Sequence, residues 1–313
     1  MVIFLFCQQS ETSFLLVFLF TINSLWYNCT EVIMERKSYA KINLSLDSLY
    51  KREDGYHEID TIMTRISLFD TLKIEKNDTN RIRIKTNSQE LLDENIENNL
   101  IYKAWYMLKD RVKSCGVDVV LEKNIPIAAG LAGGSTDCAE MILALNDLWD
   151  LKMSDEEIFE IGKSLGADIP FFFLKKSARA QGIGEILSGF DINLDMKILL
   201  VNDGTAISSN FVYKRLGDYG NIDTEKIIEG LKSSDKNIVK DFKNVMEDVV
   251  YDNFPHLLEI KNRLEKLGAS KALLSGSGAS IFAIFFDEDK INKALDSIKN
   301  DYKFVERVNL IDD

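Results

Sequence analysis

A glycine-rich run at residues 125–139, IPIAAGLAGGSTDCA, holds the residue types with the most evident chemistry in this chain. Its three glycines, Gly130, Gly133 and Gly134, precede the hydroxyl residues Ser135 and Thr136. Glycine lets the backbone turn through positive φ and approach a ligand closely. Where such a turn opens a helix, the free N–H groups and the helix dipole favour an anion. The run therefore predicts a phosphate-binding loop.

The spacing within this run separates it from two common phosphate loops. No lysine follows Gly134, so it is not the P-loop of nucleoside triphosphatases. Its glycine spacing and Pro126 also differ from the dinucleotide-binding fingerprint. Taken alone, the run is also compatible with an ordinary tight connection between a strand and a helix.

Two elements must position this loop. The stretch Val117–Ile127 has the pattern of a strand, and residues 138–149 repeat apolar side chains at helical spacing. Before them, residues 58–66 and 70–75 are expected as two strands, and residues 81–86, RIRIKT, as a half-buried antiparallel strand. After them, residues 154–157, SDEE, resemble a capping box that opens a short helix to Leu165. The sequence GADIPFFF is then expected to enter another strand.

Strands and helices follow one another without regular alternation, which favours an α+β fold over a doubly wound sheet. We expect domains at residues 34–195 and 196–313. Residues 1–33 contain no Lys or Arg, unlike the rest of the chain, and Met34 is a plausible start. We interpret residues 1–33 as a non-native or poorly ordered extension, with a membrane anchor as the alternative.

The composition bounds the function. The chain has 313 residues, 46% of them hydrophobic, with a net charge of −12 and a pI near 4.9. This acidity argues against a nucleic-acid surface, which needs a basic patch. The four Cys show no metal-ligand spacing, and two His cannot supply a multi-histidine metal site. The cysteine usage favours a reducing cytoplasm.

Three separated motifs together resemble a known superfamily. They are SYAKINLSLDSLYKREDGYHEIDTIM (residues 38–63), IPIAAGLAGGSTDCAEMILALNDLW (residues 125–149) and LLSGSGASIFAIF (residues 273–285). Their order is similar to that of the GHMP small-molecule kinases. The combination of AKIN, DGYHE and GADIPFF resembles the subfamily that acts on 4-diphosphocytidyl-2-C-methyl-D-erythritol, in the non-mevalonate isoprenoid pathway.

This resemblance implies a fold and a reaction. The fold would be the two-domain GHMP kinase fold, with a ribosomal-protein-S5-like N-terminal domain and a ferredoxin-like α/β C-terminal domain. The reaction would transfer the γ-phosphoryl group of ATP to the substrate's 2-hydroxyl, with Mg²⁺ as cofactor. By resemblance, Asp168 would orient or deprotonate the hydroxyl, and Lys41 would stabilise the developing charge. By residue type alone, both are also compatible with ordinary structural roles.

The resemblance also implies two sets of binding residues. Those for the cytidyl substrate would be Asn43, Tyr56, His57, Ser209, Tyr213, Gly276 and Ser277. Within this set, His57 would bond the cytosine edge while Tyr56 and Tyr213 flank the ring. Those for ATP would be Asn99, Leu100, Pro126, Ala129, Gly130, Leu131, Ala132, Gly133, Gly134, Ser135 and Thr136. Ala132 departs from the common family pattern, which has a glycine there.

Two alternatives to a cytidyl-substrate kinase stay open. One is a GHMP kinase for another alcohol, such as mevalonate or homoserine, and the DGYH turn speaks against it because such substrates have no base. The other is a non-catalytic or RNA-binding protein, which the acidity and the retention of both Lys41 and Asp168 disfavour. We expect a cytoplasmic monomer or weak homodimer without nucleic-acid partners or stable membrane association.

Overall fold

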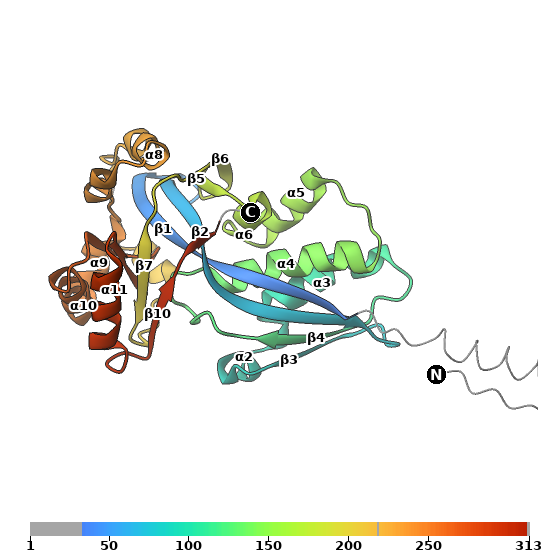
Figure 1. The fold of residues 1–313 in the computed structure, drawn as a ribbon. Helices are drawn as coiled ribbons and strands as arrows, with labels where there is room; N and C mark the ends of the chain where they lie inside the picture. The colour runs from blue at the N-terminus through green and yellow to red at the C-terminus, as the bar shows by residue number, and fades with distance from the viewer. Residues whose placement is uncertain (1–32, 218, 312–313) are drawn as a thin grey trace, which may run out of the picture. The chain divides into compact units, whose positions relative to one another are not determined.

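The computed structural model describes residues 33–217 and 219–311, and the structural statements below concern these residues (Figure 1). Within them, seven strands form a first sheet around two long strands that pair antiparallel along their whole length. These strands are β1 (Met34–Lys51), β2 (His57–Lys76), β3 (Ile82–Thr86), β4 (Val117–Glu122), β5 (Ser177–Gly182), β6 (Ile186–Phe190) and β11 (Leu310–Ile311). Strand β2 pairs with β1 along one edge and with β4, β5 and β11 along the other.

Helices cover one face of the first sheet, and their apolar residues share a core with β2, β4 and β5. They are α3 (Leu100–Leu108), α4 (Gly133–Leu148), α5 (Asp155–Leu165) and α6 (Ile169–Leu174). Ser154 caps α5 through the predicted capping box with Glu157. Shorter pieces near α3 are α2 (Gln89–Asp93), η1 (Ile96–Asn98) and η2 (Lys109–Arg111).

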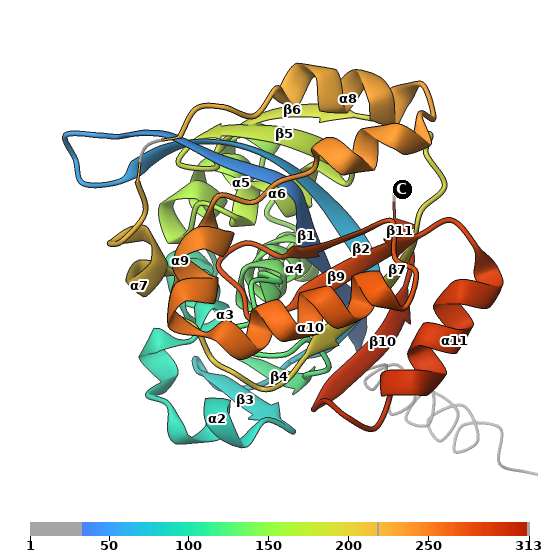
Figure 2. The same cartoon turned by 90° about the vertical axis from the view of Figure 1, so that its left-hand side faces the viewer.

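A second sheet of four antiparallel strands, in the order β10-β7-β9-β8, forms from the C-terminal half of the described residues. Its strands are β7 (Lys197–Asn202), β8 (Lys271–Leu274), β9 (Ile281–Phe285) and β10 (Phe304–Val308). Figure 2 shows α10 (Pro255–Lys266) and α11 (Glu288–Ile298) over its outer face. The remaining elements are α7 (Ser209–Tyr213), α8 (Thr224–Lys232), η3 (Lys236–Asp241) and α9 (Met246–Asn253).

The two sheets share one hydrophobic core. Side chains alternate across a strand, so β7 sends Ile198 and Leu200 into a cluster with Ile42 of β1. Its intervening residues, Leu199 and Val201, belong to a separate cluster with the outer helices. Buried on both faces, the second sheet is therefore fixed against the first, and residues from both can form one stable site.

The structure corrects several expected elements. Residues 58–66 and 70–75 belong to one continuous strand, β2, because no turn interrupts its pairing with β1. The strand at residues 81–86 is present, but it pairs with β4 in parallel rather than antiparallel. The strand expected at Val117–Ile127 ends at Glu122, so its last five residues join the glycine-rich loop.

The run IPFFF is a helix, α6, and the strand expected there is wrong. Pro170 occupies the start of the helix, where a proline is tolerated because the first N–H groups have no helical partner. Phe171 and Phe172 are buried edge-to-face, and α6 packs on α4 and α5. A continuous apolar run of this length does not by itself distinguish a buried helix from a buried strand.

The sequence predicts no stable membrane association and gives a membrane anchor only as the alternative for residues 1–33. Along the stretches that the structure describes, no helix is both long and apolar enough to cross a membrane. The extension expected at residues 1–33 lies outside the described residues except for Ile33.

Candidate active site

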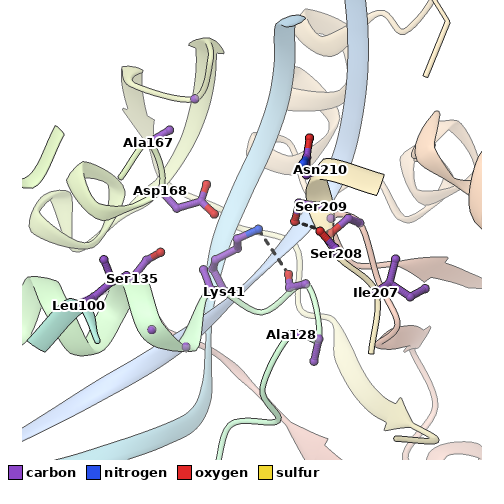
Figure 3. Close-up of a pocket in the computed structure, with 18 of the residues that line it drawn as sticks. Lys41, Leu100, Ala128, Ser135, Ala167, Asp168, Ile207, Ser208, Ser209 and Asn210 are labelled. Atoms are coloured by element: carbon purple, nitrogen blue, oxygen red, sulfur yellow. Dashed lines mark hydrogen bonds between the residues drawn. The ribbon is translucent and has the colours of Figure 1, made fainter. Parts of the chain in front are cut away.

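A cavity of about 940 Å³ opens between the glycine-rich loop, β1, β2 and α7 (Figure 3). Most residues singled out from the sequence line it. These are Lys41, Asn43, Tyr56, His57, Asn99, Leu100, Pro126, Ala129, Gly130, Ala132, Gly133, Gly134, Ser135, Asp168, Ser209, Tyr213, Gly276 and Ser277. Leu131 and Thr136 do not line the cavity, and each is only 1% exposed.

The glycine-rich loop ends earlier than the sequence suggested. Helix α4 begins at Gly133, so Gly134 and Ser135 lie in its first turn, where N–H groups have no helical partner. Ala132 precedes the helix in the left-handed region, at φ 56° and ψ 33°. A glycine would adopt that conformation at about 1 kcal/mol lower cost. The loop geometry expected of a glycine is thus preserved by an alanine under strain.

The third motif holds this loop from the side of the second sheet. The Ser275 hydroxyl donates to the Gly130 carbonyl at 3.0 Å, and the Ser280 N–H donates to the Ala129 carbonyl at 3.2 Å. A Cβ on Gly130 would lie 2.0 Å from the Ser275 carbonyl oxygen. Gly130 is therefore required by close backbone packing as well as by its φ of +75°.

Lys41 lies on β1 and reaches the cavity with only 4% of its surface exposed. Its ammonium donates to Asn43 Oδ1 at 2.6 Å and to the Gly130 carbonyl at 3.4 Å. Burial lowers the pKa of Lys41, and the nearby Asp168 carboxylate acts in the opposite direction. The result is a desolvated cation at the floor of the phosphate loop.

Asp168 occupies the N-cap position of α6, yet its side chain makes no capping bond. Its carboxylate instead points across the cavity toward Lys41 (Figure 3). It also acts on Tyr213, whose hydroxyl pKa is raised by burial and further by Asp168. A carboxylate that leaves its helix uncapped and faces a buried ammonium is placed to accept a proton from a bound hydroxyl.

His57 and Tyr213 form an aromatic wall of the cavity. Their rings stack with centroids 5.6 Å apart and planes inclined by 29°. Both ring nitrogens of His57 are buried and have no hydrogen-bond partner among the described residues, so a bound ligand can satisfy them. Tyr56 lines the same cavity but is 60% exposed. At the far end, Asn99 caps α3 by accepting from the Ile101 N–H at 2.8 Å.

Comparison with known families gives this geometry a context. Two family descriptions match the chain: GHMP kinases N terminal domain at residues 99–176 and GHMP kinases C terminal at residues 223–303. A 4-diphosphocytidyl-2-C-methyl-D-erythritol kinase of Clostridioides difficile is 39% identical over 282 residues, covering 87% of this chain and 94% of the relative. The chain belongs to the 4-diphosphocytidyl-2-C-methyl-D-erythritol kinase family.

Other members and solved structures agree. The family member of Thermoanaerobacter pseudethanolicus is 41% identical, over 86% of this chain and 93% of its own. A crystal structure of a 4-(cytidine 5'-diphospho)-2C-methyl-D-erythritol kinase superposes with a TM-score of 0.75 at 30% identity, over 88% of this chain and 99% of that one. Homoserine kinase from Cytophaga hutchinsonii has a TM-score of 0.68 at 15% identity, over 91% and 96%, and shares the fold.

Membership in this family confirms the expected two-domain GHMP kinase fold. The chain is a small-molecule kinase, and GHMP kinase membership implies that it uses ATP. It is not a non-catalytic protein that merely shares one domain with these kinases, because the match to this kinase family extends over most of the chain.

The sequence-based reasoning missed a buried charge cluster at the start of α4. Lys123 donates to Asp137 at 2.9 Å and to Asp70, and both Lys123 and Asp137 line the cavity. Burial opposes the charge on Lys123, but the two carboxylates more than offset this and raise its pKa. The signal was a lysine three residues before Pro126 in an acidic chain that has to gather cations around a phosphate.

This cluster predicts a pH dependence of stability. Burial raises the pKa of the Asp137 carboxyl to about 7, and Lys123 offsets this only in part. The unfolded carboxyl ionises near 3.8, so between these values the folded state binds more protons and stability falls as pH rises. We expect Asp137→Asn to remove most of this fall between pH 5 and pH 8.

The measurement is the free energy of unfolding in urea at several pH values. Asp195→Asn, at a carboxylate whose side chain is 86% exposed, is the control and should keep the wild-type slope. An Asp137→Asn slope equal to that of the wild type would show that Asp137 is already ionised throughout this range.

Proposed function

We propose that this protein transfers the γ-phosphoryl group of ATP to the 2-hydroxyl of 4-diphosphocytidyl-2-C-methyl-D-erythritol, within the non-mevalonate isoprenoid pathway. The substrate oxygen attacks the γ-phosphorus, the bond to the bridging oxygen breaks, and ADP leaves. The observation that carries this proposal is a single cavity holding the phosphate loop, the Lys41–Asp168 pair and the His57–Tyr213 wall. Family membership supplies the substrate class.

The catalytic work falls to two residues. Asp168 accepts the proton of the attacking hydroxyl, or orients that hydroxyl for attack. Lys41 stabilises the negative charge that develops on the transferred group, and its burial strengthens this interaction because water does not screen it. The 2.6 Å bond from Lys41 to Asn43 fixes the direction of the ammonium.

The phosphate loop and its helix would hold ATP. The triphosphate lies along residues 129–136, and Asn99 and Leu100 border the adenine. Mg²⁺ usually keeps several waters and takes one or two protein ligands besides phosphate oxygens. The described residues contain no group of three or more His, Cys, Asp or Glu side chains suited to a metal. The Ser135 hydroxyl at the helix start fits such a phosphate-held ion, which would neutralise charge on the phosphates.

The cytidyl group would occupy the aromatic end. The two unsatisfied nitrogens of His57 supply a donor and an acceptor for the cytosine edge, with Tyr213 and Tyr56 flanking the ring. The substrate's diphosphate lies near Gly276 and Ser277, whose hydroxyl is 2.8 Å from that of Ser209. Asn43 contacts the methylerythritol moiety.

The remaining expectations belong to this proposal as well. Domains at residues 34–195 and 196–313 put the boundary in the connection between β6, an edge strand of the first sheet, and β7, the first strand of the second sheet along the chain. Residues 1–33 would be dispensable for activity. The protein would act in the cytoplasm as a monomer or weak homodimer, without nucleic-acid partners.

The proposal is tested by ADP release with a panel of acceptor alcohols. We expect turnover with 4-diphosphocytidyl-2-C-methyl-D-erythritol and none with mevalonate, homoserine or galactose, in the full chain and in a chain that starts at Met34. His57→Ala should raise KM for the cytidyl substrate by about 10-fold or more, because a base then loses its edge contacts. Turnover with another alcohol alone would replace the proposed substrate.

Thr61 determines which way Asn43 points. The Thr61 hydroxyl donates to the Ser45 carbonyl at 2.5 Å, which leaves its oxygen to accept from the Asn43 amide at 2.9 Å. The Asn43 oxygen must then face Lys41. Thr61→Val keeps the shape but removes the acceptor, and we expect kcat to fall about 10-fold with KM for ATP unchanged. Thr64→Val, at a buried hydroxyl of the same strand that bonds the Ser177 hydroxyl at 2.9 Å, is the control and should keep the wild-type kcat.

A further inference from the structure

A strap of the chain connects the second sheet to the aromatic wall of the cavity. It comprises residues 205–222, without residue 218, and contains α7. Through α7 it places Ser209 and Tyr213 in the cavity. Its first half is fixed near the third motif by the bond between the Ser209 and Ser277 hydroxyls. Its second half leaves α7 and returns to β1.

A buried carboxylate on β1 receives the end of this strap. Asp47 is 0% exposed, and its two oxygens accept from the Gly220 N–H at 3.1 Å and the Ile222 N–H at 2.8 Å. The next residue, Ser48, accepts from the Tyr219 N–H at 2.8 Å through its carbonyl. Hydrogen bonds to an ionised acceptor are about twice as strong as neutral ones. The strap therefore ends in a charge-assisted attachment.

This attachment lies on the same ladder as His57. In the pairing of β1 with β2, Asp47 is opposite Asp60 and Lys51 is opposite His57. His57 thus lies three positions before Asp60 on β2, or about 10 Å along the strand from the attachment. Tyr213, which stacks on His57 at 5.6 Å, lies seven residues before Gly220 on the strap. The β1–β2 ladder therefore carries His57 and also anchors the strap that carries Tyr213.

We propose that Asp47 is a positioning residue that sets the affinity of the site for the cytidyl group. Asp47 does not line the cavity, so it acts through the strap. By holding residues 220 and 222 on β1, it keeps the ring of Tyr213 stacked on His57. The two rings are then already in position when the cytosine base binds. The proposal rests on the proposed function, since it assumes that the cytidyl group binds at this wall.

The test is Asp47→Asn, which replaces one acceptor oxygen with an NH₂ group facing a backbone N–H donor. We expect KM for the cytidyl substrate to rise about 10-fold, with kcat and KM for ATP within about threefold of the wild type. The matched control is Asp60→Asn on the same rung. Arg179 holds that carboxylate at 2.7 and 2.8 Å, and neither of these two residues lines the cavity, so KM should stay at the wild-type value.

A double-variant cycle separates positioning from general loosening of the fold. In a Tyr213→Ala background, Asp47→Asn should change KM by less than about twofold, because residues that act through one another are not additive. Multiplied effects of the two substitutions on KM, or an equal rise of KM for the cytidyl substrate and for ATP, would overturn the proposal. If Asp47→Asn does not fold, Asp47→Glu keeps both acceptors but shifts the strap, and it should raise the same KM severalfold.

The wild-type protein, measured in the same assay, separates the two levels of inference. If the wild type does not phosphorylate the cytidyl substrate, both the proposed function and the proposed role of Asp47 are wrong. An active wild type with an Asp47→Asn variant of unchanged KM would remove only the role of Asp47.

Discussion

Asp168→Asn should lower kcat by a factor of about 10² to 10⁴, the range expected when a positioned general base is lost. The amide has nearly the same shape and cannot accept a proton from the substrate hydroxyl. Because Asp168 makes no bond that caps α6, the fold should be retained. KM for ATP should change little, since we propose that the phosphate loop and helix α4 make the nucleotide contacts.

The control for this variant is Asp223→Asn, which makes the same chemical change at another helix N-cap. Asp223 does cap its helix, by accepting from the Lys226 N–H at 3.0 Å, and it is exposed outside the cavity. Its turnover should equal that of the wild type. Steady-state ADP release and calorimetric ATP binding measure both variants. An Asp168→Asn enzyme with kcat within threefold of the wild type would show that another group accepts the proton of the substrate hydroxyl.

The elements that the sequence predicted correctly are those with strong local signals. The helix at residues 138–149 and the capping box at Ser154 follow from spacing and hydrogen-bonding chemistry within one turn. The run at Ile169–Leu174 and the parallel pairing of β3 with β4 depend on what packs against them. The local sequence pattern does not show which partners pack against a segment. Tertiary contacts therefore determine both the helix at Ile169–Leu174 and the parallel pairing of β3.

The residues of the candidate site show the same difference between local signals and distant partners. Lys41, Asp168 and His57 could be named as candidates because each lies in a motif that resembles the kinase family. Asp47, Thr61 and Lys123 were missed. Their importance comes from partners far away in the chain: Gly220 and Ile222 for Asp47, and Asp70 for Lys123. A charged or hydroxyl residue on a strand has no distinctive pattern until its partner is known.

The glycine-rich loop allows its structural and ligand-binding requirements to be separated. Gly130 lies at φ +75°, and a methyl group there would meet the Ser275 carbonyl oxygen at 2.0 Å. Backbone atoms cannot move aside cheaply, so we expect Gly130→Ala to destabilise the fold by about 2–4 kcal/mol. The loop would also lose its contact with the third motif, and turnover should fall more than about 100-fold.

Gly134→Ala should behave differently. The space beside Gly134 is open, since a Cβ there would find only Leu100 Cδ1 at 3.7 Å, an ordinary contact distance. Alanine favours a helix over glycine by about 0.5–1 kcal/mol, so the melting temperature should hold or rise. The methyl group would nevertheless stand where a phosphate approaches the first turn of α4, and KM for ATP should rise about 10-fold or more.

Thermal unfolding and KM for ATP together distinguish the two glycines, with Gly189→Ala on β6 as the control for an added methyl group away from the cavity. Gly130→Ala with wild-type stability would mean that the third motif can withdraw from the loop. Gly134→Ala with unchanged KM for ATP would mean that the phosphates stay farther from α4 than proposed. The glycines would then serve only the chain's own packing.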